Sequence, residues 1–166
     1  MSPFRPDLVD CWIFRVPGGG AVKAEVLLLR RAPARILPGL WQCVSGSFEP
    51  GERIAAAALR EVEEETGFGP RVIETFYDLD LVNEFHEPSV DAVVTSAVFA
   101  VRLRPDVEPV LSHEHDGARW LSLADARAEV VWPAYRTAID RIGEDLMDPV
   151  RSPWFELDLD GRRVVG

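Results

Sequence analysis

Residues 46–68 read GSFEPGERIAAAALREVEEETGF, and this stretch is the strongest indication of the fold in the sequence. It predicts a helix over about residues 53–66 that ends at Gly67, a residue type that commonly follows the last turn of a helix. At about 100° per residue, Glu61, Glu64 and Glu65 fall within about a third of a turn of one another. The residues expected to face the core point roughly the opposite way, namely Ala55, Leu59, Val62 and Thr66.

Three carboxylates on one helix face need a counter-charge. Like charges at this spacing repel by a few tenths of a kcal/mol in water, and by more in a cleft. Mg²⁺ binds through carboxylate oxygens and substrate phosphates, so a divalent cation would relieve the repulsion. The alternative is a solvated glutamate-rich face, which is common on helices. We therefore first expect a metal-dependent enzyme that acts on a phosphorylated substrate.

The spacing of the whole segment favours the metal over the solvated face. The positions that carry the pattern are Gly46, Glu52, Arg60, Glu61, Glu64, Glu65, Gly67 and Phe68. This pattern resembles the signature of the Nudix hydrolase family, with Phe68 aromatic where an aliphatic residue is commoner. The resemblance covers roughly residues 8–145. It implies an α/β/α sandwich and the cleavage of a nucleoside diphosphate linked to another moiety, by attack of water on phosphorus.

The resemblance also assigns metal ligands. Glu61, Glu64 and Glu65 match the metal-binding glutamates of the family, and the carbonyl of Gly46 is a further candidate ligand. We expect Glu64 and Glu65 to face solvent, and Glu61 is also a candidate general base. Because all these ligands are oxygen atoms, Mg²⁺ is the expected cofactor and Mn²⁺ a candidate substitute.

Other residues are candidates for supporting roles at this site. Glu52 and Arg60 match a pair that braces the loop against the helix in the family. Enzymes of this kind often take one more carboxylate from outside the motif, and Glu114 in the segment SHEHD (residues 112–116) is our choice, as ligand or base. A solvated surface turn is the alternative for Glu114, and Glu84 is the second candidate. A zinc site at His113 and His115 is weakly indicated, since no cysteine or third histidine lies nearby.

Substrate contacts are predicted from arginines and aromatic residues. Arg30, Arg31 and Arg35 flank the motif and suit bidentate binding of phosphates, with surface ion pairing as the alternative. Trp41 and Trp132 are candidates to stack on a base or a pterin, with core packing as the alternative.

The order of elements predicts an α/β fold, with a mixed sheet and helices on both faces. Strands are expected at residues 8–14, 24–30, 41–45, 72–82, 92–103 and 118–121, and residues 83–91 are expected to be a linker. A brief helix should begin at Ser122 or Leu123, and Pro133 should open a final helix to about Leu146.

Length and charge limit the remaining choices. The 166 residues suit one domain with a core at about 8–146 and a tail at 147–166, in which Asp160-Gly161 predicts a hairpin. The edge of that hairpin is a candidate contact for a homodimer. The net charge of −10 argues against a nucleic-acid polymer as partner. No apolar run approaches the roughly 20 residues that cross a bilayer, and we see no signal peptide, so no membrane contact and a cytoplasmic location are expected.

A narrower resemblance concerns the substrate. The segment WQCVSGS (residues 41–47), Glu114-His115 and Trp120-Leu121 are similar to the bacterial dihydroneopterin triphosphate pyrophosphatases. This implies release of pyrophosphate from a pterin or nucleoside triphosphate. An ADP-ribose or dinucleoside polyphosphate hydrolase is the alternative. An alternative of another class is a non-catalytic Nudix module that senses a nucleotide.

Overall fold

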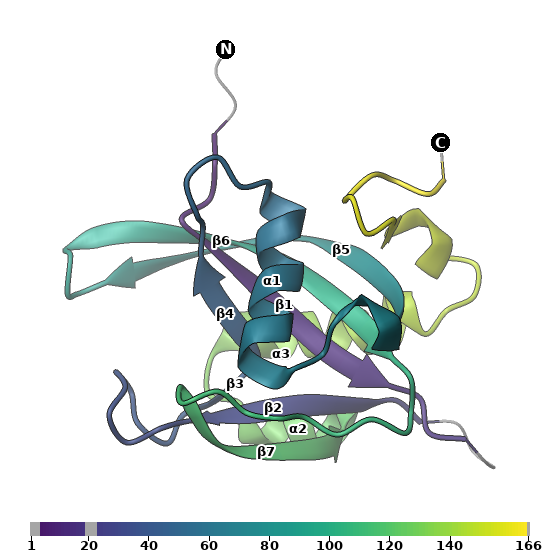
Figure 1. Ribbon diagram of the computed structural model, residues 1–166, viewed down its shortest axis with the longest axis horizontal. Helices are drawn as coiled ribbons and strands as arrows, with labels where there is room; N and C mark the ends of the chain where they lie inside the picture. Colours follow the sequence, from purple (N-terminus) through teal and green to yellow (C-terminus); the bar gives the residue numbers. More distant parts are fainter. Residues whose placement is uncertain (1–3, 19–22, 166) are drawn as a thin grey trace.

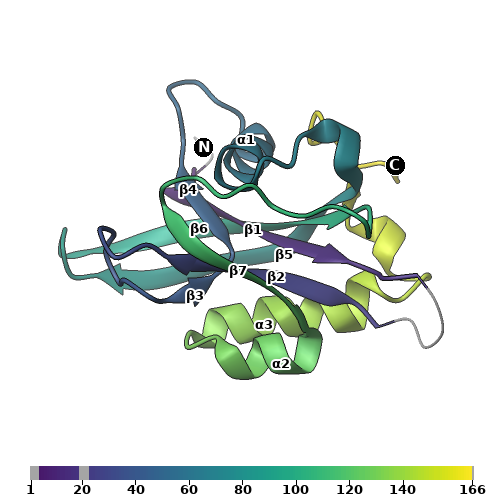
Figure 2. The same cartoon turned by 60° about the horizontal axis from the view of Figure 1, so that its bottom comes forward.

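The computed structural model describes residues 4–18 and 23–165. Within them, a mixed eight-stranded sheet lies between α1 (Ile54–Thr66) on one face and α2 (Leu123–Glu129) and α3 (Pro133–Arg141) on the other (Figures 1 and 2). The strands are β1 (Leu8–Arg15), β2 (Glu25–Arg31), β3 (Trp41–Gln42), β4 (Val44–Ser47), β5 (Ile73–Glu87), β6 (Ala92–Leu103), β7 (His115–Ser122) and β8 (Glu156–Leu157). The predicted α/β sandwich is confirmed.

Strand β1 is the centre of the sheet. It pairs antiparallel with β2 and β4 and parallel with β6. Because β1 is covered on both faces, its side chains alternate between two cores. Val9 and Ile13 pack on the α1 side, whereas Trp12 and Phe14 pack on the α2 and α3 side. Pairing of Val9 with Gly46 brings the start of the motif directly beside α1.

Helix α1 matches its predicted bounds because its local signals agree. Ala57 and Ala58 are fully buried, and their small side chains allow the helix to approach the sheet closely. Gly67 adopts φ 73°, a left-handed conformation in which glycine carries no steric penalty, and its N–H donates to the carbonyl of Glu63. The acidic side chains at 61, 64 and 65 are thereby fixed on a rigid element.

The expected linker at residues 83–91 was wrong in part. Strand β5 continues to Glu87 and forms a long hairpin with β6, which extends past β1. The pairing shifts between Asp78 and Leu81, and Asp80 adopts φ 53° there. The expected strand at 41–45 is divided into β3 and β4, and the final helix passes into a π-helical turn at Ile142–Leu146.

The C-terminal tail folds back onto its own sheet. Strand β8 pairs with β5, and Leu157 also bridges Arg163 across a short turn. A Cβ atom at Gly161 would lie 2.4 Å from the Cβ of Ala55, so the tail presses against the first turn of α1. The tail thus covers part of a sheet edge within the chain, and the homodimer stays a prediction. No helix among the described residues is long and apolar enough to cross a membrane.

Candidate active site

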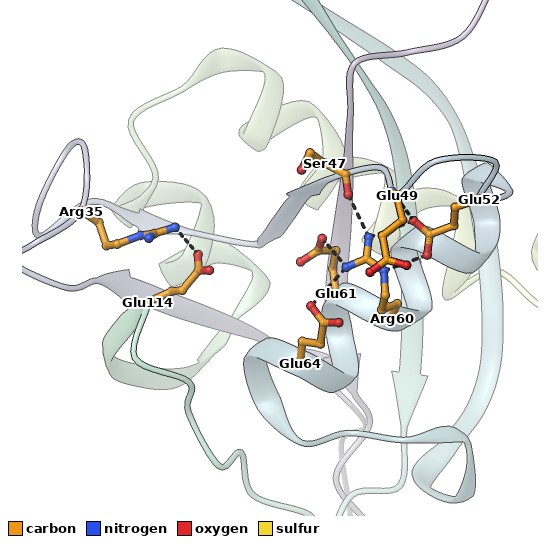
Figure 3. A network of polar contacts seen from close by, with 8 residues as sticks. All are labelled: Arg35, Ser47, Glu49, Glu52, Arg60, Glu61, Glu64 and Glu114. Carbon is orange, nitrogen blue, oxygen red and sulfur yellow. Dashed lines mark hydrogen bonds and ion pairs between the residues drawn. The ribbon is translucent and has the colours of Figure 1, made fainter.

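Arg60 joins the loop before α1 to the acidic face of the helix (Figure 3). Its guanidinium donates to both carboxylate oxygens of Glu52, at 2.7 and 2.9 Å, and to the carbonyl of Ser47 at 2.9 Å. Glu52 also accepts the backbone N–H of Glu49 at 2.9 Å. The hydrogen bonds from Arg60 lower the pKa of Glu52, so this pair stays charged over a wide pH range. Glu52 and Arg60 lie where sequence analysis expects the brace.

The same guanidinium holds two of the helix carboxylates. Arg60 Nη1 donates to Glu61 at 2.7 Å and to Glu64 at 3.1 Å. Glu61 lies against the backbone of Gly46, because a Cβ atom there would fall only 2.0 Å from Glu61 Cδ. Burial raises the pKa of Glu61, and the hydrogen bond from Arg60 acts against that rise. Gly46 therefore makes room for a carboxylate that the helix presents to β4.

Glu65 does not face solvent as expected, since only 3% of it is exposed. It is the second-last residue of α1, where backbone bonds attach the helix to the following loop: Ser112 N–H donates to the Glu65 carbonyl, and Val110 N–H to that of Thr66. Burial, with help from the charges of Glu61 and Glu114, raises the pKa of Glu65 to about 9. Burial disfavours the charged form of this carboxylate, and a bound cation would stabilise that charged form.

Glu114 reaches the site from the loop before β7. Its carboxylate pairs with Arg35 at 2.8 Å, and its charge contributes to the raised pKa values of Glu61 and Glu65. The backbone N–H of Ala32 donates to the Glu114 carbonyl. In Figure 3, Glu61 and Glu64 lie between Arg60 on one side of the view and the pair of Arg35 and Glu114 on the other. The second candidate, Glu84, lies exposed in the β5–β6 hairpin.

The other predicted substrate contacts are only partly gathered there. Arg30 pairs with Asp116 at 2.8 Å, and Arg31 donates to the side chain of Gln42 at 3.3 Å, so both are held within the chain. Trp41 begins β3 and lies under the guanidinium of Arg119, 4.4 Å from the ring centroid. Trp132 precedes α3, which covers the opposite face of the sheet from α1, and the structure does not bring it to the carboxylates.

A hollow in the described part of the chain lies away from these carboxylates. It has a volume of about 680 Å³ and lies between the first turn of α1 and the tail, beside Ile54, Leu157 and Gly161. None of the candidate metal ligands lines it. The candidate active site is instead at the acidic end of α1, where Glu64 is exposed and Glu65 is buried.

Two observations indicate that these residues could hold a divalent cation. Glu65 Oε2 is buried without a hydrogen-bond partner among the described residues, and the cradle at Gly46 holds the carboxylate of Glu61. Within residues 4–18 and 23–165, however, no group of three His, Cys, Asp or Glu side chains is already arranged to hold a metal ion. Arg60 contacts one oxygen of Glu61 and one oxygen of Glu64, so the other oxygen of each carboxylate is not held by Arg60.

Comparison with known proteins agrees with this arrangement. A family model described as the NUDIX domain matches residues 6–142. The chain belongs to the NUDIX family. Hydrolases of this family act on pyrophosphate bonds and generally need a divalent metal.

The chain is also similar to individual proteins. A curated protein from Myxococcus xanthus named octanoyltransferase is 36% identical over 125 residues, which cover 74% of this chain and 33% of that protein. The chain thus spans about a third of the length of this relative. The solved structure of a NUDIX hydrolase from Listeria monocytogenes has a TM-score of 0.70 at 28% identity, covering 84% of this chain and 93% of that chain. The E. coli dihydroneopterin triphosphate pyrophosphohydrolase has a TM-score of 0.61 at 28% identity, covering 80% and 95%.

Sequence analysis named His115 only as a zinc candidate and as part of a resemblance, and it did not place His115 beside Glu65 or Gln42 beside His115. His115 is 6% exposed, and its Nδ1 lies 3.6 Å from Glu65 Oε2. Its Nε2 lies 3.2 Å from Nε2 of Gln42, which is also buried. Burial lowers the pKa of His115. A polar residue inside an apolar stretch, as Gln42 is between Trp41 and Cys43, is the signal that could have drawn attention to this region.

Proposed function

We propose that the protein is a Mg²⁺-dependent pyrophosphohydrolase that releases pyrophosphate from a nucleoside triphosphate or a related pterin triphosphate. The observation that carries the proposal is the contact set of Arg60, which bonds Glu52, Ser47, Glu61 and Glu64 at once. Such a contact set fixes a row of carboxylates relative to the loop on which a phosphate chain would lie. The 28% identity to the E. coli pyrophosphohydrolase supports this choice of substrate class.

The ligands proposed for the metal are Glu61, Glu64, Glu65 and Glu114, with the carbonyl of Gly46. When bound, Mg²⁺ would neutralise charge on the phosphate oxygens and lower the pKa of water. The proposed ligand atoms are all oxygen, which suits Mg²⁺, and Mn²⁺ is the expected substitute. The net charge of −10 makes this neutralisation necessary for a polyanionic substrate.

Side chains of the protein are proposed to position the carboxylates, bind the phosphate chain and accept the proton of the attacking water. Arg60 positions Glu61 and Glu64, and the Arg35 guanidinium pairs with Glu114, the proposed ligand from outside the helix. We assign Arg35 to the phosphate chain, which would displace it from Glu114. Glu61 and Glu114 are the two candidates for the base that takes the proton from the attacking water. Burial raises the pKa of Glu61 and the hydrogen bond from Arg60 lowers it, whereas Glu114 is held by its ion pair with Arg35.

A substrate panel tests the proposal. Purified protein with Mg²⁺ is assayed for pyrophosphate and for phosphate release from nucleoside triphosphates, dihydroneopterin triphosphate, ADP-ribose and dinucleoside polyphosphates. We expect pyrophosphate from the triphosphates as the main product. Preferential cleavage of ADP-ribose or a dinucleoside polyphosphate would replace this proposal with the alternative hydrolase.

Two neighbouring glutamates provide a matched pair of variants for the same assay. Glu64→Gln should lower turnover by about 100-fold or more, because it removes a charged ligand from the acidic face. Glu63→Gln should leave turnover unchanged, because Glu63 is exposed and points away from that face. Equal rates for the two variants would remove Glu64 from the mechanism.

A further inference from the structure

His115 and Glu65 form a buried polar pair at the end of α1. Only 6% of His115 and 3% of Glu65 are exposed. His115 Nδ1 and Glu65 Oε2 are 3.6 Å apart, beyond the range of about 2.7–3.2 Å for an N–H···O hydrogen bond. Neither atom has another hydrogen-bond partner in the described part of the chain. Buried polar atoms are nearly always hydrogen-bonded, and for each of these two atoms the nearest available partner is the other.

The register of β7 is what turns His115 toward Glu65. Ala118 and Trp120 pack on the α1 side of the sheet, so strict alternation would send residue 115 to the opposite side. The pairing shifts by one residue at this point: Arg30 pairs with Gly117, but Arg31 pairs with His115. The bulge at Asp116 therefore moves His115 to the α1 face. Bulges commonly re-aim a side chain in this way beside active sites.

The neighbours of His115 determine which ring nitrogen carries the proton. Arg31 Nη1 lies 3.3 Å from Gln42 Oε1, and a guanidinium can only donate, so the amide oxygen of Gln42 must face Arg31. The amide nitrogen of Gln42 then faces His115 Nε2 at 3.2 Å. Because that amide nitrogen also only donates, Nε2 must accept. The proton of a neutral ring is thereby assigned to Nδ1, the atom that faces Glu65.

We propose that His115 is a positioning residue for Glu65: its Nδ1–H donates to Glu65 Oε2, and the contacts from Arg31 through Gln42 fix the tautomer that makes this possible. The inference rests on the proposed function, in which Glu65 is a metal ligand. A hydrogen bond to Oε2 fixes the plane of the carboxylate, to which the backbone N–H of Ser45 also donates, and so fixes the orientation that the carboxylate presents to the cation. Removing such a partner of a metal ligand typically weakens metal affinity by about 10–100-fold.

The tautomer itself is the first test, and it needs neither metal nor substrate. Two-bond ¹⁵N–¹H correlation spectra of the metal-free protein report which nitrogen of each imidazole is protonated. His86 and His113 are exposed and serve as internal references. We expect His115 to carry its proton on Nδ1. A proton on Nε2 alone, or on both nitrogens at pH 7.5, would overturn the proposal.

Two variants of His115 separate positioning from packing. The amide nitrogen of His115→Asn occupies the place of Nδ1, whereas that of His115→Gln occupies the place of Nε2. Mn²⁺ binding, measured by the loss of the free-ion signal in electron paramagnetic resonance, should weaken by 10–100-fold in His115→Gln. It should stay within about 3-fold of the wild type in His115→Asn. Packing alone predicts the reverse order, since Asn leaves the larger void.

A control and a separate outcome complete the design. His113→Gln, two residues away on the exposed loop, should bind Mn²⁺ as the wild type does. Equal loss in both His115 variants, or greater loss in His115→Asn, would overturn the proposal. Failure of the wild type to bind Mn²⁺ at all would remove the proposed function, while the tautomer measurement would still decide the contact between His115 and Glu65.

Discussion

Replacing Gly46 with alanine tests the close contact between β4 and α1. The new Cβ atom would lie 2.0 Å from Glu61 Cδ, whereas non-bonded carbons approach to about 3.5–4.0 Å. Glu61 must therefore retreat by at least about 1.5 Å, which breaks its 2.7 Å hydrogen bond with Arg60. Because a displacement of about 1 Å at a reacting site costs about 100-fold in rate, we expect kcat to fall by about 100-fold or more.

The fold should survive this change. The atom that gives way is the far end of a flexible side chain, and Gly46 has no left-handed φ that would strain an alanine. We expect the free energy of unfolding to change by less than about 1 kcal/mol. Gly18→Ala is the matched control, since no atom lies within 4 Å of its added Cβ.

The assay is Mg²⁺-dependent pyrophosphate release, with urea denaturation of each variant measured alongside it. Glu61→Gln, which keeps the shape and removes the charge, should resemble Gly46→Ala in rate. Wild-type kcat in Gly46→Ala would refute the reasoning, because it would mean that the position of Glu61 does not matter.

Three further predictions concern other parts of the site and of the sheet. Arg60→Lys loses the two-pronged hydrogen bonding to Glu52 and should lower the free energy of unfolding by about 1–3 kcal/mol, seen as a fall in Tm of about 3–10 °C. An unchanged Tm would contradict the role of Arg60 and Glu52 in bracing the loop against the helix. Glu114→Gln should lower kcat far more than Tm, and an unaltered rate would reject Glu114 as ligand or base. Burial raises the pKa of Asp10, so the folded chain keeps a proton that the unfolded chain loses above about pH 4, and stability should fall as pH rises from about 4 toward that raised pKa. Asp10→Asn should therefore gain stability over the wild type between pH 5 and 7 in urea titrations, whereas the exposed control Asp91→Asn should not; parallel profiles for Asp10→Asn and the wild type would contradict the shift.

Helix α1 could be predicted from sequence because the signals that favour it are local. Alanines that face the sheet, glutamates on one face and a glycine at the end all lie within 23 residues, and each favours the same helix. The close placement of Glu52 and Arg60 was also predictable, through the resemblance to the family. Their roles in catalysis stay predictions until variants are assayed.

What depends on strand register could not be predicted. The inward orientation of His115 depends on a one-residue bulge, and nothing local to SHEHD indicates it. The burial of Glu65 depends on contacts with the loop at 110–112, which lies more than 40 residues further along the chain. Residues 83–87 look like a polar linker because Phe85 is the one apolar residue among them, and they form a strand through their pairing with β6.

The most direct test of the central claim is the metal dependence of pyrophosphate release by Glu64→Gln and Glu65→Gln beside the wild type. The claim is that the glutamates of α1 hold the divalent cation that hydrolysis requires. We predict that the wild type needs added Mg²⁺ and that both variants lose most turnover while keeping their circular dichroism spectrum. Full activity of either variant without added metal would contradict the mechanism.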